Sequence, residues 1–140
     1  MNRSLVSLAL LAACSGSTDP ASDVRMSLLV EPAQVALGDT VRITVIAFNP
    51  TDRTIELLPS QCGHSLAPTV TDPAGGTHQL WGGPSICPIF DDNVLAPNET
   101  DSVTWRWKAG PQTGSYVVRG GIARGTELVN PTPPFTLAVN

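Results

Sequence analysis

The sequence predicts an all-β protein, an immunoglobulin-like β-sandwich of seven to eight antiparallel strands. Thirteen prolines and twelve glycines are spread along the 140 residues, and such frequent turn residues are typical of short strands joined by tight connections. Several apolar runs alternate with period two, whereas no run has the 3.6-residue period of a convincing helix, and no internal repeat is present.

The first half of the predicted domain contains three strands. Residues 26–32 (MSLLVEP) and 40–48 (TVRITVIAF) are separated by the turn LGD, and residues 54–58 (TIELL) follow the turn NPTDR. In the second run Arg42 and Thr44 share one face. The opposite face carries four apolar residues, Val41, Ile43, Val45 and Ala47.

The second half contains the clearest alternation. Residues 68–81 predict a hairpin that reverses at DPAGG. In residues 102–108 the side chains of Trp105 and Trp107 share a face with a valine, whereas Arg106 lies on the other face. We expect both tryptophans to pack in the core, because each can bury a large area between sheets. Residues 114–123 (GSYVVRGGIA) and 134–139 (PFTLAV) complete the set.

The N-terminus predicts export and lipid attachment. Residues 5–13 form an apolar run that suits a signal peptide and is too short to span a bilayer. The run ends in LAAC, which resembles a bacterial lipobox and implies that Cys14 becomes the acylated first residue of the mature chain. An ordinary secretory signal cut nearby is the alternative. Several acyl chains hold a protein stably on its membrane.

We therefore divide the chain into a signal peptide (1–13), the lipidated cysteine with a flexible tether (14–24) and one β-sandwich domain (25–140). The expected location is a bacterial membrane, and Ser15 favours the outer membrane if the cell has two. The tether is rich in Ser, Asp and Pro, so we expect it to be disordered.

The charge of the chain argues against nucleic acid as a partner. The net charge is −4, Lys108 is the only lysine, and no basic cluster is apparent along the sequence. No second apolar run approaches membrane length.

The order of motifs resembles the intracellular proteinase inhibitor (BsuPI-like) family over residues 28–139. Members share an Asn-containing turn after the second strand, a v-D-x-x-G-x-x-v-W hairpin, an L-x-P-G-E-t turn before a W-x-W strand, and a final G-x-Y strand. The matching positions are Asn49, Asp72, Gly75 or Gly76, Trp81, Leu95, Pro97, Glu99, Thr100, Trp105, Trp107, Gly114 and Tyr116. The resemblance implies an immunoglobulin-like sandwich and protease inhibition. Asn98 replaces the family's turn glycine, and a lipoprotein signal replaces its cytoplasmic setting.

Two cysteines remain once Cys14 is assigned to the lipid. In an exported protein, Cys62 and Cys87 favour a disulfide, which would stabilise the fold by roughly 3.5 kcal/mol through loop closure. The alternative is a copper or zinc site formed by Cys62, His64, His78 and Cys87, although only Cys62 and His64 have the close spacing of zinc ligands. The disulfide is the prediction; no metal or other cofactor is expected.

No catalytic motif is apparent. The chain lacks a G-x-S-x-G elbow, and Asp91 and Asp92 are adjacent, so strand alternation would point them apart. We predict a non-enzymatic module that binds a protein or peptide partner at the cell envelope. The candidate binding segments are residues 61–67 and 82–93, which the disulfide would join. Their candidate contact residues are Gln61, His64, Ser65, Trp81, Pro84, Ile86, Asp91 and Asp92. An exposed edge strand is a further mode of binding.

Overall fold

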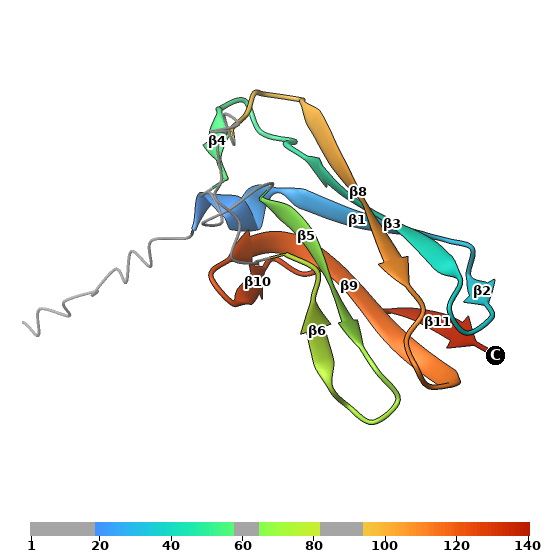
Figure 1. Cartoon of the computed structure of the whole chain (residues 1–140). Helices are drawn as coiled ribbons and strands as arrows, with labels where there is room; N and C mark the ends of the chain where they lie inside the picture. The colour runs from blue at the N-terminus through green and yellow to red at the C-terminus, as the bar shows by residue number, and fades with distance from the viewer. Residues whose placement is uncertain (1–18, 58–64, 82–93) are drawn as a thin grey trace, which may run out of the picture.

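The computed structural model describes residues 19–57, 65–81 and 94–140 (Figure 1). After the short 3₁₀ helix η1 (Pro20–Asp23), these residues form eleven strands. The strands are β1 (Arg25–Glu31), β2 (Gln34–Val35), β3 (Thr40–Phe48), β4 (Ile55–Glu56), β5 (Leu66–Thr71), β6 (Thr77–Gln79), β7 (Val94–Leu95), β8 (Thr100–Lys108), β9 (Gly114–Arg124), β10 (Glu127–Val129) and β11 (Phe135–Val139).

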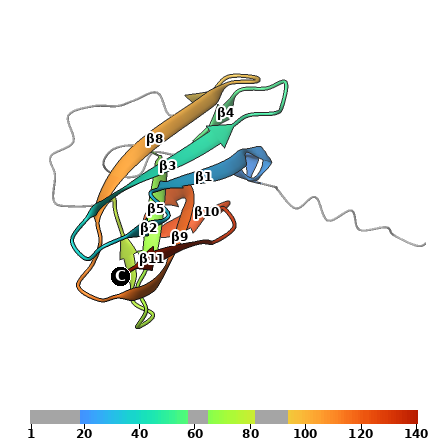
Figure 2. The same cartoon turned by 90° about the vertical axis from the view of Figure 1, so that its right-hand side faces the viewer.

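The strands form a two-layered sandwich, whose layers are seen from the side in Figure 2. One layer is a three-stranded sheet in the order β1-β3-β8. The other has the order β2-β11-β9-β5-β6, with β10 paired to β9, and β4 pairs separately with β7. Figure 1 places η1 and β4 at one end of the sandwich, and β2 and the C-terminus at the opposite end.

The predicted alternation of the second strand is confirmed. Strand β3 spans the predicted residues 40–48, and the four side chains expected on its apolar face are completely buried. They stay on one face because no bulge interrupts the alternation of β3. The register is continuous with both neighbours, from Glu31↔Arg42 to Arg25↔Phe48 on one side and along all nine residues of β8 on the other.

The predicted fold is confirmed, with more strands than expected and one parallel pair. Strands β2, β7 and β10 are only two or three residues long, and β2 pairs in parallel with β11. The connection at Pro32 carries the chain from the small sheet into the large one, so β2 lies beside the last strand. Two-residue strands carry no alternation, which is why the pattern of the sequence does not reveal them.

Tyr116 fixes the beginning of β9 inside the core. Its side chain is 1% exposed, its ring centroid lies 5.2 Å from that of Trp107, and its hydroxyl donates to the carbonyl of Gln112 at 2.9 Å. A tyrosine that bonds back to the backbone upstream is a recurring feature of immunoglobulin-like sandwiches.

The two tryptophans of β8 face the core as predicted, but both are only partly buried. The reason is the position of β8, since among the described strands it is paired on one side alone. Trp105 reaches across to the other sheet, where its indole N–H donates to the carbonyl of Leu66 at 3.1 Å. The two rings therefore line the flank of the sandwich next to β8.

The predicted flexible tether is wrong for residues 19–24. Residues 20–23 form η1, and Ala21 and Val24 are buried against the sandwich. The sequence SGSTDPASD has no large apolar residue, but small side chains suffice here because polar contacts from distant parts of the chain hold the segment. Residues 14–18 of the tether lie outside the described residues.

Candidate functional site

Two of the predicted contact residues are buried and cannot contact a partner in this structure. Ser65 is 2% exposed and Trp81 is 5% exposed. Trp81 packs with Ala67 and Ala123, and its indole N–H donates to the carbonyl of Gly125 at 3.1 Å. Trp81 is therefore a core residue of the large sheet, and its prediction as a binding residue is wrong.

The other predicted contact residues lie outside the described residues; they are Gln61, His64, Pro84, Ile86, Asp91 and Asp92. Cys62 and Cys87 also lie outside them. The described residues that flank these stretches meet in pairs. Pairing of β4 with β7 sets Glu56 opposite Val94. At the other ends, Ala123 donates its N–H to the carbonyl of Ser65 at 2.6 Å and also packs against Trp81.

Asn49 connects the turn after β3 with the turn between β7 and β8, at the η1 end of the sandwich. Its side chain is fully buried, and its Nδ2 donates to the carbonyls of Arg53, Leu95 and Ala96 at 2.8, 3.0 and 3.1 Å. Its Oδ1 accepts hydrogen bonds from the backbone N–H and the hydroxyl of Thr51 at 3.0 and 2.7 Å. Each of these polar groups has a partner, so this buried amide has a structural role.

The segment after the predicted lipid site is pinned by two ion pairs. Asp19 caps η1 by accepting the N–H of Ala21 at 3.0 Å, and its carboxylate lies 2.5 Å from Nη1 of Arg124. The hydrogen bond from Arg124 is the main cause that lowers the pKa of Asp19, with the N–H of Ala21 next. Arg53 contacts Asp23 in the same way at 2.5 Å. The amide of Asn130 donates to the carbonyls of Ala21 and Val24.

The predicted hairpin is confirmed, and Asp72 organises its turn. The carboxylate accepts the N–H groups of Ala74 and Gly76 at 2.9 and 2.8 Å, and Oδ2 lies 3.0 Å from Nε2 of His78. These contacts lower the pKa of Asp72, with the His78 hydrogen bond contributing most. Gly75 supplies the positive φ of 90° that the turn requires.

His78 is exposed, as expected for a hairpin residue. In the part of the chain that the structure describes, no three His, Cys, Asp or Glu side chains gather where a metal ion could be held. Three of the four residues of the metal hypothesis, Cys62, His64 and Cys87, lie outside that part. The described residues also contain no helix long and apolar enough to cross a membrane.

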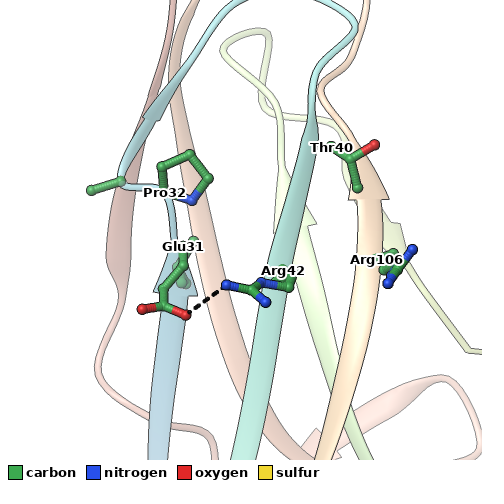
Figure 3. Close-up of a pocket in the computed structure, with 7 residues that line it drawn as sticks. Glu31, Pro32, Thr40, Arg42 and Arg106 are labelled. Atoms are coloured by element: carbon green, nitrogen blue, oxygen red, sulfur yellow. Dashed lines mark hydrogen bonds and ion pairs between the residues drawn. The ribbon is translucent and has the colours of Figure 1, made fainter.

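A charged row crosses the outer face of the small sheet, and it was missed in the sequence. Register sets Glu31 opposite Arg42, and Arg42 opposite Arg106. Figure 3 shows Arg42 inclined toward Glu31, with a separation of 3.5 Å between Nη2 and Oε2, and Arg106 turned away from Arg42 on the next strand. This arrangement reduces the repulsion between two arginines in directly opposite positions.

The row borders an open hollow of about 620 Å³, which also includes Pro32, Ala33 and Thr40 in its lining. It lies at the end of the small sheet where β3 begins, opposite to η1. The polar face of the alternating strands 40–48 and 100–108 was a signal for these side chains, but only the register brings Arg42 and Arg106 side by side.

Comparison with known proteins identifies the fold alone. No protein-family model and no curated protein matches the sequence. Among solved structures, the CARDB domain of a Pyrococcus furiosus protein is 16% identical with a TM-score of 0.51, over 84% of this chain and 94% of that domain. A crystal structure of the same domain, in complex with di-metal ions, has a TM-score of 0.50. Both support the immunoglobulin-like sandwich.

Two similar structures belong to enzymes of unrelated function. One is the alkylpurine DNA glycosylase AlkC of Pseudomonas fluorescens, which is 11% identical with a TM-score of 0.57. The other is a β-glucosidase of Erythrobacter marinus, which is 14% identical with a TM-score of 0.53. Each match covers 84% of this chain, but the chain spans only 30% of the glycosylase and 15% of the glucosidase. At such low identity these likenesses describe architecture and say nothing about activity.

Proposed function

We propose that this protein is an exported, lipid-anchored envelope protein whose β-sandwich binds a protein or peptide partner. The observation that carries the proposal is the docking of residues 19–24. The predicted acylation site at Cys14 is separated from the pinned Asp19 by only four residues. Five residue steps span at most about 18 Å, so the anchor would keep the η1 end of the sandwich near the lipid headgroups.

Such an anchor would also orient the domain. Strand β1 leaves η1 and runs for seven residues, about 23 Å, toward Glu31. The charged row and its hollow are therefore at the end of the small sheet that would face away from the membrane. This is a suitable place to meet another envelope protein.

Binding by strand addition is supported by the unequal width of the two layers. Three strands face a larger sheet, and no described strand pairs with the outer side of β8. An unpaired strand edge is a ready template for an extended segment of another protein. Protease inhibition gains no support from the geometry, because the matched residues Asn49, Trp81 and Tyr116 are buried and hold turns and core together.

The disulfide between Cys62 and Cys87 remains part of the proposal. Contacts between described residues that flank the two cysteine-bearing stretches support it: Glu56 pairs with Val94, and Ala123 contacts both Ser65 and Trp81. Thiol counting on protein isolated without reductant tests the disulfide. Two free thiols besides Cys14 would contradict it and revive the metal hypothesis.

The anchor is tested by comparing the wild type with Cys14→Ser in a bacterial host. We expect the wild type to remain with the membrane fraction and its N-terminal peptide to carry acyl chains by mass spectrometry, whereas Cys14→Ser is found in the soluble fraction. An unmodified N-terminal peptide in the wild type would overturn the lipoprotein assignment.

The binding role is tested separately by site-specific photo-crosslinking in cells of the source organism. A photoreactive residue at Ser102, on the outer face of β8, should give a discrete crosslinked product of higher mass. The matched control is Thr136, which is exposed on β11 in the other sheet. Absence of any product from Ser102, or equal products from both sites, would contradict binding at β8.

A further inference from the structure

Strand β8 is the longest strand with an edge that no described strand covers. It pairs with β3 over all nine residues without a bulge, and it contains no proline. Natural edge strands are protected from unwanted pairing by proline, bulges, short length or charge. Of these devices β8 has only charge, so the charges determine which strand can pair with it.

The charges on the outer face of β8 are Arg106 and Lys108. Arg106 has Arg42 directly opposite on β3, and no carboxylate of the described residues lies within ion-pair distance of it. Lys108 stands two residues further along the same face, opposite Thr40. The row across the sheet therefore reads Glu31, Arg42, Arg106, with its one carboxylate on β1 and two neighbouring guanidinium groups on β3 and β8 (Figure 3). A carboxylate on the open side of Arg106 would balance the second guanidinium.

The inner face of β8 offers apolar contact. Val103, Trp105 and Trp107 alternate with the outer-face residues, the last of which are Arg106 and Lys108, and are only partly buried. Because Trp105 bonds to Leu66 on the facing sheet, its ring spans the flank of the sandwich beside the open edge. Apolar side chains of an added strand would pack on these rings.

We propose that β8 receives an extended segment of a partner protein in which two carboxylates stand two residues apart and alternate with apolar residues. The carboxylates pair with Arg106 and Lys108 on the outer face, and the apolar side chains cover the two tryptophans on the inner face. This inference rests on the proposed binding function and adds to it the surface and the chemistry of the partner.

The same charges favour an acidic segment over other occupants of this edge. A second copy pairing antiparallel through the full length of its own β8 would set Arg106 opposite Ser102 and Lys108 opposite Thr100, so neither cation would gain a carboxylate. The opposite edge strand, β1, ends in Glu31 and would repel an acidic segment at the corresponding position. Strands β2 and β6 have only two and three residues.

The inference is tested by titrating the full-length protein with short peptides and following tryptophan fluorescence. The probe has the sequence TEVEVET, the charge control is TKVKVKT, and the order control TVVEEET has the composition of the probe without alternation. We expect the probe to bind about tenfold more tightly than either control, from two favourable cross-strand pairs and one apolar face. Added salt should weaken its binding.

Charge reversal in the protein tests the assigned residues. The double variant Arg106→Glu/Lys108→Glu should reverse the preference between TEVEVET and TKVKVKT. The matched control is Arg119→Glu, because Arg119 is exposed on β9 in the other sheet and has no ion pair within the described residues. That control should leave the affinity unchanged within about twofold, since distant sites act independently.

Backbone methylation distinguishes strand addition from simple charge attraction. A strand donates hydrogen bonds to a neighbour through alternate N–H groups. Methylating one alternate set of amides in TEVEVET should abolish binding, and methylating the other set should not. Equal binding of both methylated peptides, or an unchanged preference in the double variant, would overturn the inference. Because acylation and crosslinking in cells are measured independently, a negative peptide result with a crosslink from Ser102 would reject only the partner chemistry proposed here.

Discussion

The two ends of the small sheet differ in their polar side chains, which are buried and fully hydrogen-bonded at one end and exposed at the other. Near η1, the amide of Asn49 is fully buried and bonded to three carbonyls and to Thr51. At the other end, Glu31, Arg42 and Arg106 are exposed, and the contact of 3.5 Å between the first two is long. The first group completes its hydrogen bonds within the chain, whereas the second retains capacity for another molecule.

This difference separates stability from recognition. Removing a buried polar group leaves its partners unsatisfied and costs much of the stability of a domain. Removing an exposed charge costs little stability but changes which molecules can approach. Substitutions at the two ends should therefore affect different measurements.

The largest effect is expected from Asn49→Ala. The substitution leaves three carbonyls and the Thr51 N–H without their buried partner, and we expect a loss of about 3 kcal/mol in the free energy of unfolding. Urea denaturation measures this loss. The same substitution at exposed Asn140 should change stability by less than about 0.5 kcal/mol. Equal effects of the two substitutions would remove the contrast between the ends.

A smaller effect is expected at Asn98, in the turn that bonds to Asn49. Asn98 has φ of 60°, a conformation that asparagine and glycine adopt more easily than alanine, and its N–H donates to the carbonyl of Asn49 at 2.9 Å. We expect Asn98→Ala to destabilise the domain by about 1 kcal/mol and Asn98→Gly to cause no loss. Urea denaturation of both variants is the check, and identical stabilities would contradict a backbone cause.

The stabilisation that Asp72 gives to the hairpin turn should depend on pH. The pKa of Asp72 is lowered below its ordinary value of 3.8, first by His78 and then by the N–H groups of Gly76 and Ala74. A lowered pKa means that Asp72 contributes its full stabilisation above pH 3.8 and loses it as the pH falls through the lower value of the folded state. An NMR titration of the carboxyl carbon should give a pKa closer to 3.8 in His78→Ala. An unchanged value in that variant would show that His78 has no influence.

The smallest effect on stability is expected from Arg106→Thr. Because Arg106 and Arg42 are directly opposite, removing one guanidinium should leave the unfolding free energy within about 0.5 kcal/mol of the wild type, with any gain appearing at low salt. Denaturation at two salt concentrations measures it, with Arg119→Thr as the control. A substantial loss in Arg106→Thr alone would assign this arginine to the fold.

Much of the fold could be predicted because long strands carry their own signal. The alternation of residues 40–48 and of residues 102–108 identifies strands β3 and β8 and their buried faces. Strand β2 could not be found in this way, since it has two residues and is defined by backbone pairing with β11. The docking of residues 19–24 could not be predicted either, because Arg124, the ion-pair partner of Asp19, is more than one hundred residues away along the chain.

The candidate surface depended on information that composition lacks. Arg42 and Arg106 are 64 residues apart, and only the register of β3 with β8 places them side by side. Trp81 was predicted to contact a partner, yet its ring packs with Ala67 and Ala123 in the core. An aromatic residue at the end of a strand can face the core or the solvent. The sequence around Trp81 contains no further feature that distinguishes the two.

The continuous register of the small sheet has a mechanical consequence. In an antiparallel pair the hydrogen bonds run perpendicular to the strands. A lipid anchor would pull at the Arg25 end of β1, and a partner on β8 would pull near Lys108 in the opposite direction. That load would pass from β1 through β3 to β8. The hydrogen bonds of each strand pair would bear it together in shear rather than breaking one after another. The three strands would then transmit tension between the membrane and the partner.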